Sequence, residues 1–227
     1  MVIAILGIIV LVVGIVLKRS PEPANRFGRL VQIIGFAVVI LGLATSMFKQ
    51  IGAGEVGVQT LFGKVQSRVL QSGLNIVNPL VEVTTFDTKT QNYTMSGVND
   101  EGTKSGDDAI RVLSYDGLEV TIDLSVLYKV NPEKTPFILQ NIGPNYEDKI
   151  VRPVSRTAIR DNAVNYQAVD LYSTKRQEFQ QKINQTIERS FERNGLQLQQ
   201  ILVRNITLPA SVKASIESKI NAEQDAR

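Results

Sequence analysis

Few side chains in this 227-residue chain could take part in catalysis, because the sequence contains no cysteine and no histidine. It therefore cannot form a disulfide, a zinc site of the usual cysteine and histidine type, or a Ser-His-Asp or Cys-His catalytic group. Two pairs of adjacent carboxylates remain, Asp107-Asp108 and Glu147-Asp148, and we interpret both as solvated surface groups. We expect no catalytic, cofactor-binding or metal-binding residue. A membrane-bound hydrolase with Ser–Lys or paired-Asp chemistry is the alternative, although no spacing singles out a Ser–Lys pair.

Two stretches of the sequence resemble ligand-binding loops only in part. Gly57 and Gly63-Lys64 are separated by five residues instead of the four of a P-loop, and Val65 stands where serine or threonine would bind magnesium. The acidic residues of Gly97–Asp108 do not have the spacing of a calcium-binding EF-hand loop. We therefore predict a hairpin turn at the first stretch and an exposed, solvated loop at the second.

The basic residues are concentrated at the N-terminus. Residues 1–50 contain five basic side chains and one acidic side chain, a net charge of +4, whereas the rest contain 20 basic and 21 acidic side chains, a net charge of −1. Domains that bind nucleic acid usually carry a basic patch or stripe. We therefore expect no nucleic-acid partner.

Two long apolar segments, residues 1–17 and 30–48, predict membrane helices and hence a membrane anchor over residues 1–49. They would be roughly 26 and 28 Å long, close to the ~30 Å hydrocarbon core of a bilayer. A cleaved signal peptide is disfavoured, because positive charge follows the first segment instead of preceding it. A shallow hairpin that re-enters the same leaflet is the alternative to two full spans. The candidate anchor residues are Ile5, Ile9, Val13, Ile34, Val38 and Leu41.

The connection between these segments carries four basic residues, Lys18, Arg19, Arg26 and Arg29. By the positive-inside rule the connection lies in the cytoplasm. The second segment then runs outward and places residues 50–227 on the extracytoplasmic side of a plasma membrane or an equivalent inner membrane.

Glycines recur seven residues apart in each apolar segment, at Gly7 and Gly14 in the first and at Gly35 and Gly42 in the second. Seven residues are about two helical turns, so each pair lies near one helix face. Small residues on one face let two membrane helices approach closely. The spacing therefore favours a close contact at these faces.

Strand patterns dominate the first part of a predicted domain at residues 50–207. Val56, Val58, Thr60 and Phe62 share one face of a strand, and a turn at Gly63-Lys64 leads to the next strand. The stretch 73–79 reads as irregular. Alternation from Leu118 to Val130, with Leu127 as the one exception, predicts a sheet with one buried and one solvated face. The predicted strands cover residues 56–62, 65–69, 81–87 with an extension to 95, 118–130 and 196–207.

Helical periodicity replaces this pattern in the second half of the domain, so the predicted fold class is α+β. An apolar stripe from Tyr146 to Ile159 predicts a helix that Pro153 begins or kinks. The next helix begins near Thr174, which has capping-box spacing to Gln177, and ends at Asn194-Gly195. Its apolar residues recur every four positions, at Phe179, Ile183, Ile187 and Phe191.

A final helix after Pro209 carries a narrow apolar stripe at Val212, Ile216 and Ile220. So narrow a stripe suits a partner helix better than a globular core. We therefore interpret residues 208–227 as the start of a coiled-coil helix and these three residues as candidate oligomerisation residues.

Five segments in the same order resemble the SPFH (band 7) family, and within it the prohibitins. The resemblance covers about Gly52–Arg227. The segments are GEVGVQTLFGKV (residues 54–65), SGLNIVNP (72–79), LEVTIDLSVLYKV (118–130), IGPNYEDKIVRPVSRTAIRD (142–161) and LPASVKASIESKINAEQDAR (208–227).

The resemblance implies a membrane-anchored scaffold that is not an enzyme. Members of this family carry an α/β domain on the membrane and a long helix beyond it, and they assemble into large rings or cages around a patch of bilayer. Several bind and restrain membrane AAA proteases of the FtsH type. The implied partners are membrane lipid, further copies of the chain and such a protease, with no cofactor. A stomatin-like regulatory subunit of a channel or transporter is a further alternative.

Overall fold

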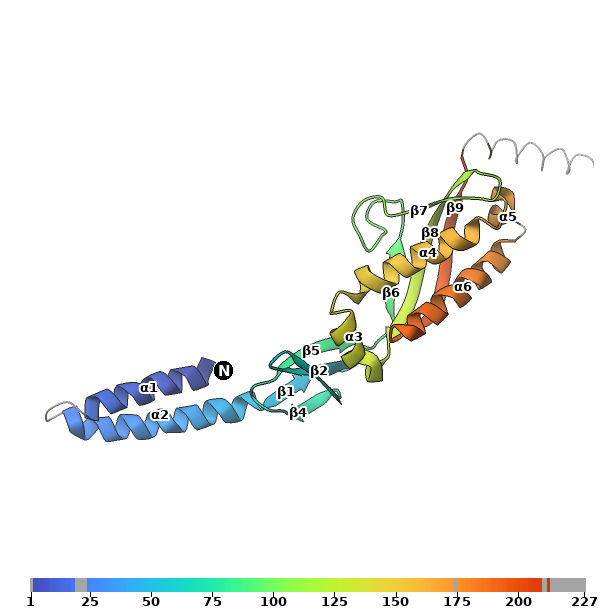
Figure 1. Cartoon of the computed structure of the whole chain (residues 1–227). Helices are drawn as coiled ribbons and strands as arrows, with labels where there is room; N and C mark the ends of the chain where they lie inside the picture. Colours follow the sequence, from blue (N-terminus) through green and yellow to red (C-terminus); the bar gives the residue numbers. More distant parts are fainter. Residues whose placement is uncertain (1, 19–23, 174, 210–211, 213–227) are drawn as a thin grey trace, which may run out of the picture. The chain divides into compact units, whose positions relative to one another are not determined.

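The computed structural model describes residues 2–18, 24–173, 175–209 and 212, and it has the α+β architecture that the sequence predicts (Figure 1). Two compact units, Met1–Thr85 and Phe86–Arg227, divide the chain. The helices are α1 (Val2–Lys18), α2 (Ala24–Ser46), α3 (Thr135–Asn141), α4 (Arg152–Ala163), α5 (Ala168–Tyr172) and α6 (Arg176–Arg193), with a 3-10 turn η1 (Pro132–Lys134) and a π-helical turn η2 (Glu147–Val151). The strands are β1 (Phe48–Ile51), β2 (Glu55–Leu61), β3 (Lys64–Leu70), β4 (Gly73–Ile76), β5 (Glu82–Asp87), β6 (Gln91–Met95), β7 (Ile110–Leu113), β8 (Glu119–Val130) and β9 (Leu196–Thr207).

Helices α1 and α2 form an antiparallel hairpin in which glycines of each helix face the backbone of the other (Figure 1). A Cβ atom added to Gly7 would lie 2.7 Å from the backbone nitrogen of Val39, and one added to Gly35 would lie 2.6 Å from that of Leu11. Such approaches are closer than real Cβ atoms make. Gly14, Gly28 and Gly42 meet Gln32, Lys18 and Ala4 in the same way. The predicted close contact at the glycine faces is therefore confirmed.

The apolar helices differ from the predicted segments at their ends. Helix α2 begins at Ala24, so it includes the second half of the predicted connection, which follows both prolines and contains good helix formers. It ends at Ser46, two residues earlier than predicted, and Phe48 already belongs to β1. The Thr45 and Ser46 hydroxyls donate to carbonyls of the last turn, those of Leu41 and Leu43.

Two small sheets complete the first unit. Strand β1 pairs antiparallel with β4, from Phe48 opposite Ile76 to Ile51 opposite Gly73. The second sheet has the order β3-β2-β5. Ile51, Leu70 and Val77 form a buried cluster between them, against which Val81 and Val83 pack. The prediction of an irregular stretch at 73–79 is therefore wrong over β4, where pairing with β1 overrides the weak local strand signal.

The β2–β3 hairpin confirms two predicted strands but moves the turn by one residue. Phe62 and Gly63, with φ of 48° and 82°, occupy the turn instead of Gly63-Lys64. Two positive φ angles match the right-handed twist of the flanking strands. Val56 and Val58 are buried as expected, whereas Phe62 is 84% exposed and does not share their face.

Strand β8 is the centre of the second unit. It pairs with β6 and β7 along one edge and with β9 along the other, and every pairing is antiparallel. Its predicted apolar face is buried from Val120 to Val130. The opposite face is half-buried instead of solvated, because Ser125 is buried there and its hydroxyl lies 2.8 Å from that of Thr94 on β6.

Helices α4 and α6 lie side by side over this sheet (Figure 1). The predicted stripe Phe179, Ile183, Ile187 and Phe191 is fully buried. Pro153 lies in the first turn of α4, directly after η2, and Gly195 ends α6 with a φ of 80°. Helix α6 begins at Arg176, and Thr174 of the predicted capping box lies outside the described residues.

The single strand predicted at 81–95 is instead two strands, β5 and β6. A turn separates them, in which the Asp87 carboxylate accepts a hydrogen bond from the Lys89 N–H.

The loop between β6 and β7 is exposed over most of its length, as predicted, but Asp108, the last residue of the predicted loop, is not solvated. The Asp108 side chain is 7% exposed, and its carboxylate accepts hydrogen bonds from the Arg152 and Arg156 guanidinium groups of α4. Two further ion pairs hold the loop, Lys104 with Asp148 at 2.7 Å and Glu101 with Arg204 at 3.1 Å. Interpreting Asp108 as a surface carboxylate is therefore wrong, since two arginines one turn apart on α4 compensate for its desolvation.

We expect the Asp108→Asn variant to unfold at a lower urea concentration than the unchanged chain, because it leaves two arginines facing a neutral amide. Breaking a buried pair costs about 3 kcal/mol or more. The matched control is Asp107→Asn, whose carboxylate is 46% exposed and pairs with Arg111; an exposed pair contributes below about 1 kcal/mol. Urea titrations of both full-length variants in detergent measure the difference, and equal shifts would contradict the role of Asp108.

We expect Gly35→Leu to open the hairpin, because its side chain would collide with the backbone of Leu11. Overpacking costs about 1–3 kcal/mol, so the thermal midpoint of helix content in detergent micelles should fall. Circular dichroism measures it. Ala37→Leu is the control, since Ala37 is exposed on the same helix. If both variants melt together, the glycine contact does not stabilise the hairpin.

Candidate functional site

The candidate site is the outer surface of the α1–α2 hairpin. Five of the six predicted anchor side chains are exposed there: Ile5 (54%), Ile9 (53%), Val13 (47%), Ile34 (56%) and Leu41 (62%). Val38 is half-buried at the edge of the helix contact. The hairpin therefore packs on its glycines and presents its large apolar side chains outward, which is the reverse of a water-soluble helical hairpin.

One of the described helices is long and apolar enough to cross a bilayer, over Phe27–Ser46 of α2. Helix α1 is a shorter apolar helix, over Ile3–Lys18. Because the helices are antiparallel, the start of α1 and the end of α2 lie at the same end of the hairpin (Figure 1).

The opposite end of the hairpin carries the predicted topology charges. The Lys18 and Arg29 side chains are exposed at this end, where Gly28 meets the Lys18 backbone. The Arg19 and Arg26 side chains lie outside the described part of the chain. Basic residues thus gather at one end of an apolar surface, the arrangement in which lysine and arginine reach the headgroups of a membrane.

The β1–β4 ribbon adds an apolar surface that was not predicted from the sequence. Phe48 is directly opposite Ile76, and Leu74 is opposite Gln50, so Phe48, Leu74 and Ile76 share one face. They are 51%, 71% and 67% exposed. The Val77 N–H donates to the Met47 carbonyl, which fastens the ribbon to the end of α2. Of these three residues, only Phe48 belonged to a predicted apolar segment, as the last residue of 30–48.

The four carboxylates of the hydrolase alternative all have structural partners. Asp107 and Asp108 pair with arginines, and Asp148 pairs with Lys104. Glu147 accepts a hydrogen bond of 2.6 Å from the Tyr128 hydroxyl. Burial, followed by this bond, raises the pKa of Tyr128. Over the described ranges, no cluster of three acidic side chains could hold a metal ion.

A buried hydroxyl lies close to this charged group. Tyr93 is 1% exposed, and its hydroxyl has no hydrogen-bond partner among the described residues. Burial, followed by the negative charge of Asp108, raises the pKa of Tyr93 to about 12. Tyr93 therefore stays neutral at physiological pH and cannot serve there as a base.

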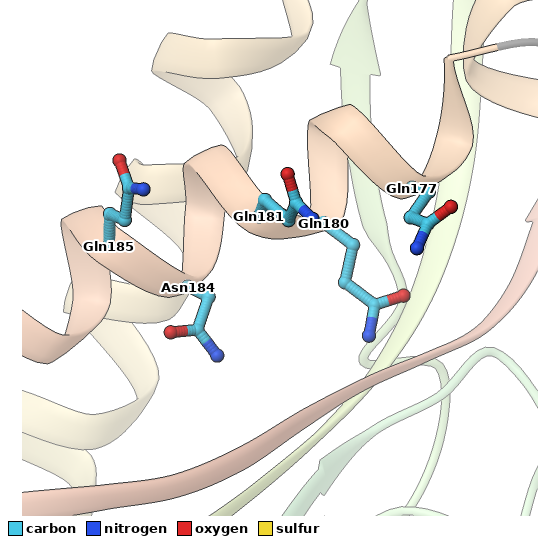
Figure 2. A pocket seen from close by; sticks show the side chains of 5 residues that line it. All are labelled: Gln177, Gln180, Gln181, Asn184 and Gln185. Carbon is cyan, nitrogen blue, oxygen red and sulfur yellow. The ribbon is translucent and has the colours of Figure 1, made fainter.

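A polar hollow of about 400 Å³ lies beside α6, and every side chain that lines it is an uncharged amide (Figure 2). The lining residues are Gln177, Gln180, Gln181, Asn184 and Gln185. Gln180 donates its Nε2 hydrogen to the Ile201 carbonyl at 2.9 Å, and Arg176 donates to the Val203 carbonyl at 2.8 Å. These groups close the outer edge of β9 with side chains; they include no nucleophile or acid–base residue.

Of the candidate oligomerisation residues, Val212 is half-buried, whereas Ile216 and Ile220 lie outside the described residues. Their role in a coiled coil stays a prediction.

Residues 49–227 match the model of the SPFH domain / Band 7 family. Prohibitin-1 of Saccharomyces cerevisiae is 22% identical over 190 residues, which are 83% of this chain and 61% of the yeast protein. Prohibitin-1 of Schizosaccharomyces pombe is 23% identical over 94% of this chain and 68% of its own length. The protein named Prohibitin-4, mitochondrial, of Arabidopsis thaliana is 22% identical over 85% of this chain and 64% of its own length.

The chain spans about three-fifths of the length of the Saccharomyces cerevisiae relative. The family model covers most of the chain, from the first residues after α2 onward. The resemblance read from the five segments is therefore confirmed, and the chain belongs to the SPFH (Band 7) family, with prohibitins among its relatives.

Proposed function

We propose that this protein is a membrane-anchored scaffold, not an enzyme, that assembles into a large ring or cage and organises a patch of bilayer. The glycine-packed hairpin with its outward apolar side chains is the observation that carries this proposal. Each large apolar side chain that leaves water gains about 1.5–3 kcal/mol. Ile5, Ile34 and Leu41 remain more than half exposed despite the contact between α1 and α2, so lipid is the environment that stabilises their outer surfaces.

The β1–β4 ribbon supplies a second membrane contact in this proposal. Phe48, Leu74 and Ile76 share an exposed apolar face, and Phe48 follows α2 by two residues. A face so close to the end of a membrane helix lies at the level of the lipid headgroups, where apolar surface of limited depth is favourable. Hairpin and ribbon together then hold the first unit against the membrane.

The assembled ring encloses membrane proteins, and a membrane AAA protease of the FtsH type is the proposed client whose access to substrates it modulates. Contacts between neighbouring copies in such a ring can each be weak. Multivalency strengthens the assembly, because each bound copy raises the effective concentration of the next. Family membership and the prohibitin relatives support a scaffold. The engaged carboxylates of the loop and η2 favour it over the hydrolase alternative. The alternative of a stomatin-like regulatory subunit has the same membrane anchor. It differs from the scaffold only in the membrane protein that it binds, a channel or transporter instead of a protease.

For orientation, we keep the positive-inside assignment. The exposed Lys18 and Arg29 side chains support a cytoplasmic position of the hairpin turn under the positive-inside rule. Because both helices return to the same end of the hairpin, residues 50–227 then lie on the extracytoplasmic side of a plasma membrane or an equivalent inner membrane.

We expect the full-length protein to elute from a sizing column in mild detergent as one discrete particle of many copies. Replacing Ile216 and Ile220 by aspartate should shrink this particle, because charges would interrupt the predicted apolar stripe. The control is Ser218→Asp, on the opposite side of the predicted helix. Light scattering measures the mass; a monomer or dimer from the unchanged chain would exclude a ring.

A membrane-impermeant maleimide tests the orientation, since the chain has no cysteine of its own. Asn99→Cys in the exposed β6–β7 loop should react in intact cells, and Ser20→Cys in the hairpin connection should react only after lysis. The reverse pattern would overturn the assigned orientation while leaving the scaffold proposal in place.

A further inference from the structure

The turn that joins β2 to β3 presents a phenylalanine to solvent in a backbone conformation that disfavours it. Phe62 has a φ of 48° and is 84% exposed. A positive φ is rare for a bulky residue, and a hairpin turn with two positive φ angles usually carries asparagine and glycine. Gly63 fits its place in this turn, with a φ of 82°, whereas Phe62 does not. The unit therefore strains its backbone to expose a large apolar side chain, and packing within the unit offsets little of that strain.

The chain path brings this turn back toward the end of α2. Strand β1 leads away from α2, and a tight turn follows it, in which the Glu55 N–H donates to the Gly52 carbonyl at 3.1 Å. Such a turn reverses the direction of the chain. A Cβ atom added to Gly57 would lie 2.9 Å from the Ile51 side chain, so β2 begins beside the far end of β1. Strand β2 then runs back, and Phe62 lies at the end of the small sheets that faces α2.

A second turn at the same end also exposes an apolar side chain. Leu80 is 50% exposed in the turn after β4, and its N–H donates to the Asn78 side-chain carbonyl at 2.9 Å. The Val81 N–H donates to the Asn78 backbone carbonyl at 3.1 Å, so the turn is held in one shape. The nearby Val77 is bonded to Met47 at the end of α2. Exposed apolar side chains from two turns therefore accompany the ribbon face at the end of the unit that carries α2.

We infer that the β2–β3 turn enters the headgroup layer of the membrane with Phe62 at its tip, and that Leu80 enters the same layer. This inference rests on the proposed membrane anchor, because α2 sets the level of both turns. A phenylalanine or leucine side chain leaves water favourably at the boundary between headgroups and acyl chains. The exposed Lys64 directly follows the turn, where its amine can reach lipid phosphates. Lipid contact then compensates for both the exposure and the strain of Phe62.

Single tryptophans test the depth of the turn, because the chain contains no tryptophan of its own. Full-length Phe62→Trp is reconstituted into vesicles of phosphatidylcholine and phosphatidylglycerol whose acyl chains are brominated near the headgroups. We expect the brominated lipid to quench the fluorescence strongly and aqueous acrylamide to quench it weakly. The matched control is Ala53→Trp, in the exposed turn at the other end of β2. Acrylamide should quench this variant, and the brominated lipid should not.

A third variant separates failure of this inference from failure of the proposed anchor. Leu41→Trp lies on the outer surface of α2, and the same brominated lipid should quench it. Quenching at position 41 without quenching at position 62 overturns the insertion of the turn alone, whereas no quenching at either position overturns the anchor as well. A tryptophan at position 62 that is shielded from both reagents is covered by protein, which also overturns the inference.

Relief of the strain gives an independent measurement. Phe62→Asn supplies the favoured Asn-Gly pair, so the full-length variant in detergent should unfold at a higher urea concentration than the unchanged chain. The same substitution removes the ring from the lipid, so a Leu80→Trp reporter should be quenched less by brominated lipid when Phe62→Asn is also present. Ser67→Asn, at an exposed position of β3, should change neither result. An unchanged urea midpoint for Phe62→Asn, or unchanged quenching of the reporter, would count against the inference.

Discussion

The contact of two helix backbones at glycine is the constraint on which the rest of the molecule depends. Gly7 and Gly35 leave no room for a methyl group between α1 and α2, so the helices meet without their large side chains. Those side chains point outward as a consequence. Lipid or another apolar surface is then needed to stabilise the outer surface of the hairpin. The same register returns α2 to the end where α1 begins, and there the β1–β4 ribbon starts.

The two units divide the work of the proposed scaffold. The first unit concentrates apolar surface on the hairpin and on the ribbon face of Phe48, Leu74 and Ile76. The second unit buries its apolar residues in an ordinary core around β8, and it secures its longest loop through Asp108 and the arginines of α4. In the proposed scaffold, membrane contact therefore belongs to the first unit.

Sequence periodicity predicted the long strands and helices but not the short elements β1, β4, β7, α3 and α5. The alternation along β8 and the four-residue stripe of α6 are set by burial within one element, so each could be read locally. Asp108 could not, because its arginine partners lie more than forty residues away and no local signal names them. Strand β4 and the turn position of Phe62 were missed because pairing with another strand decided them. The exposed ribbon face escaped notice for the same reason.

In the proposed scaffold both helices of the hairpin lie in the membrane, and this limits how closely copies can crowd in its plane. A helix with its side chains is about 10 Å across, so one hairpin displaces roughly twice as much lipid as a single-helix anchor would. Copies arranged side by side cannot approach more closely than their anchors allow, whatever attraction acts between their domains. The in-plane width of α1 and α2, which the glycines keep at its minimum, thus sets a lower limit to the spacing of copies around any closed assembly.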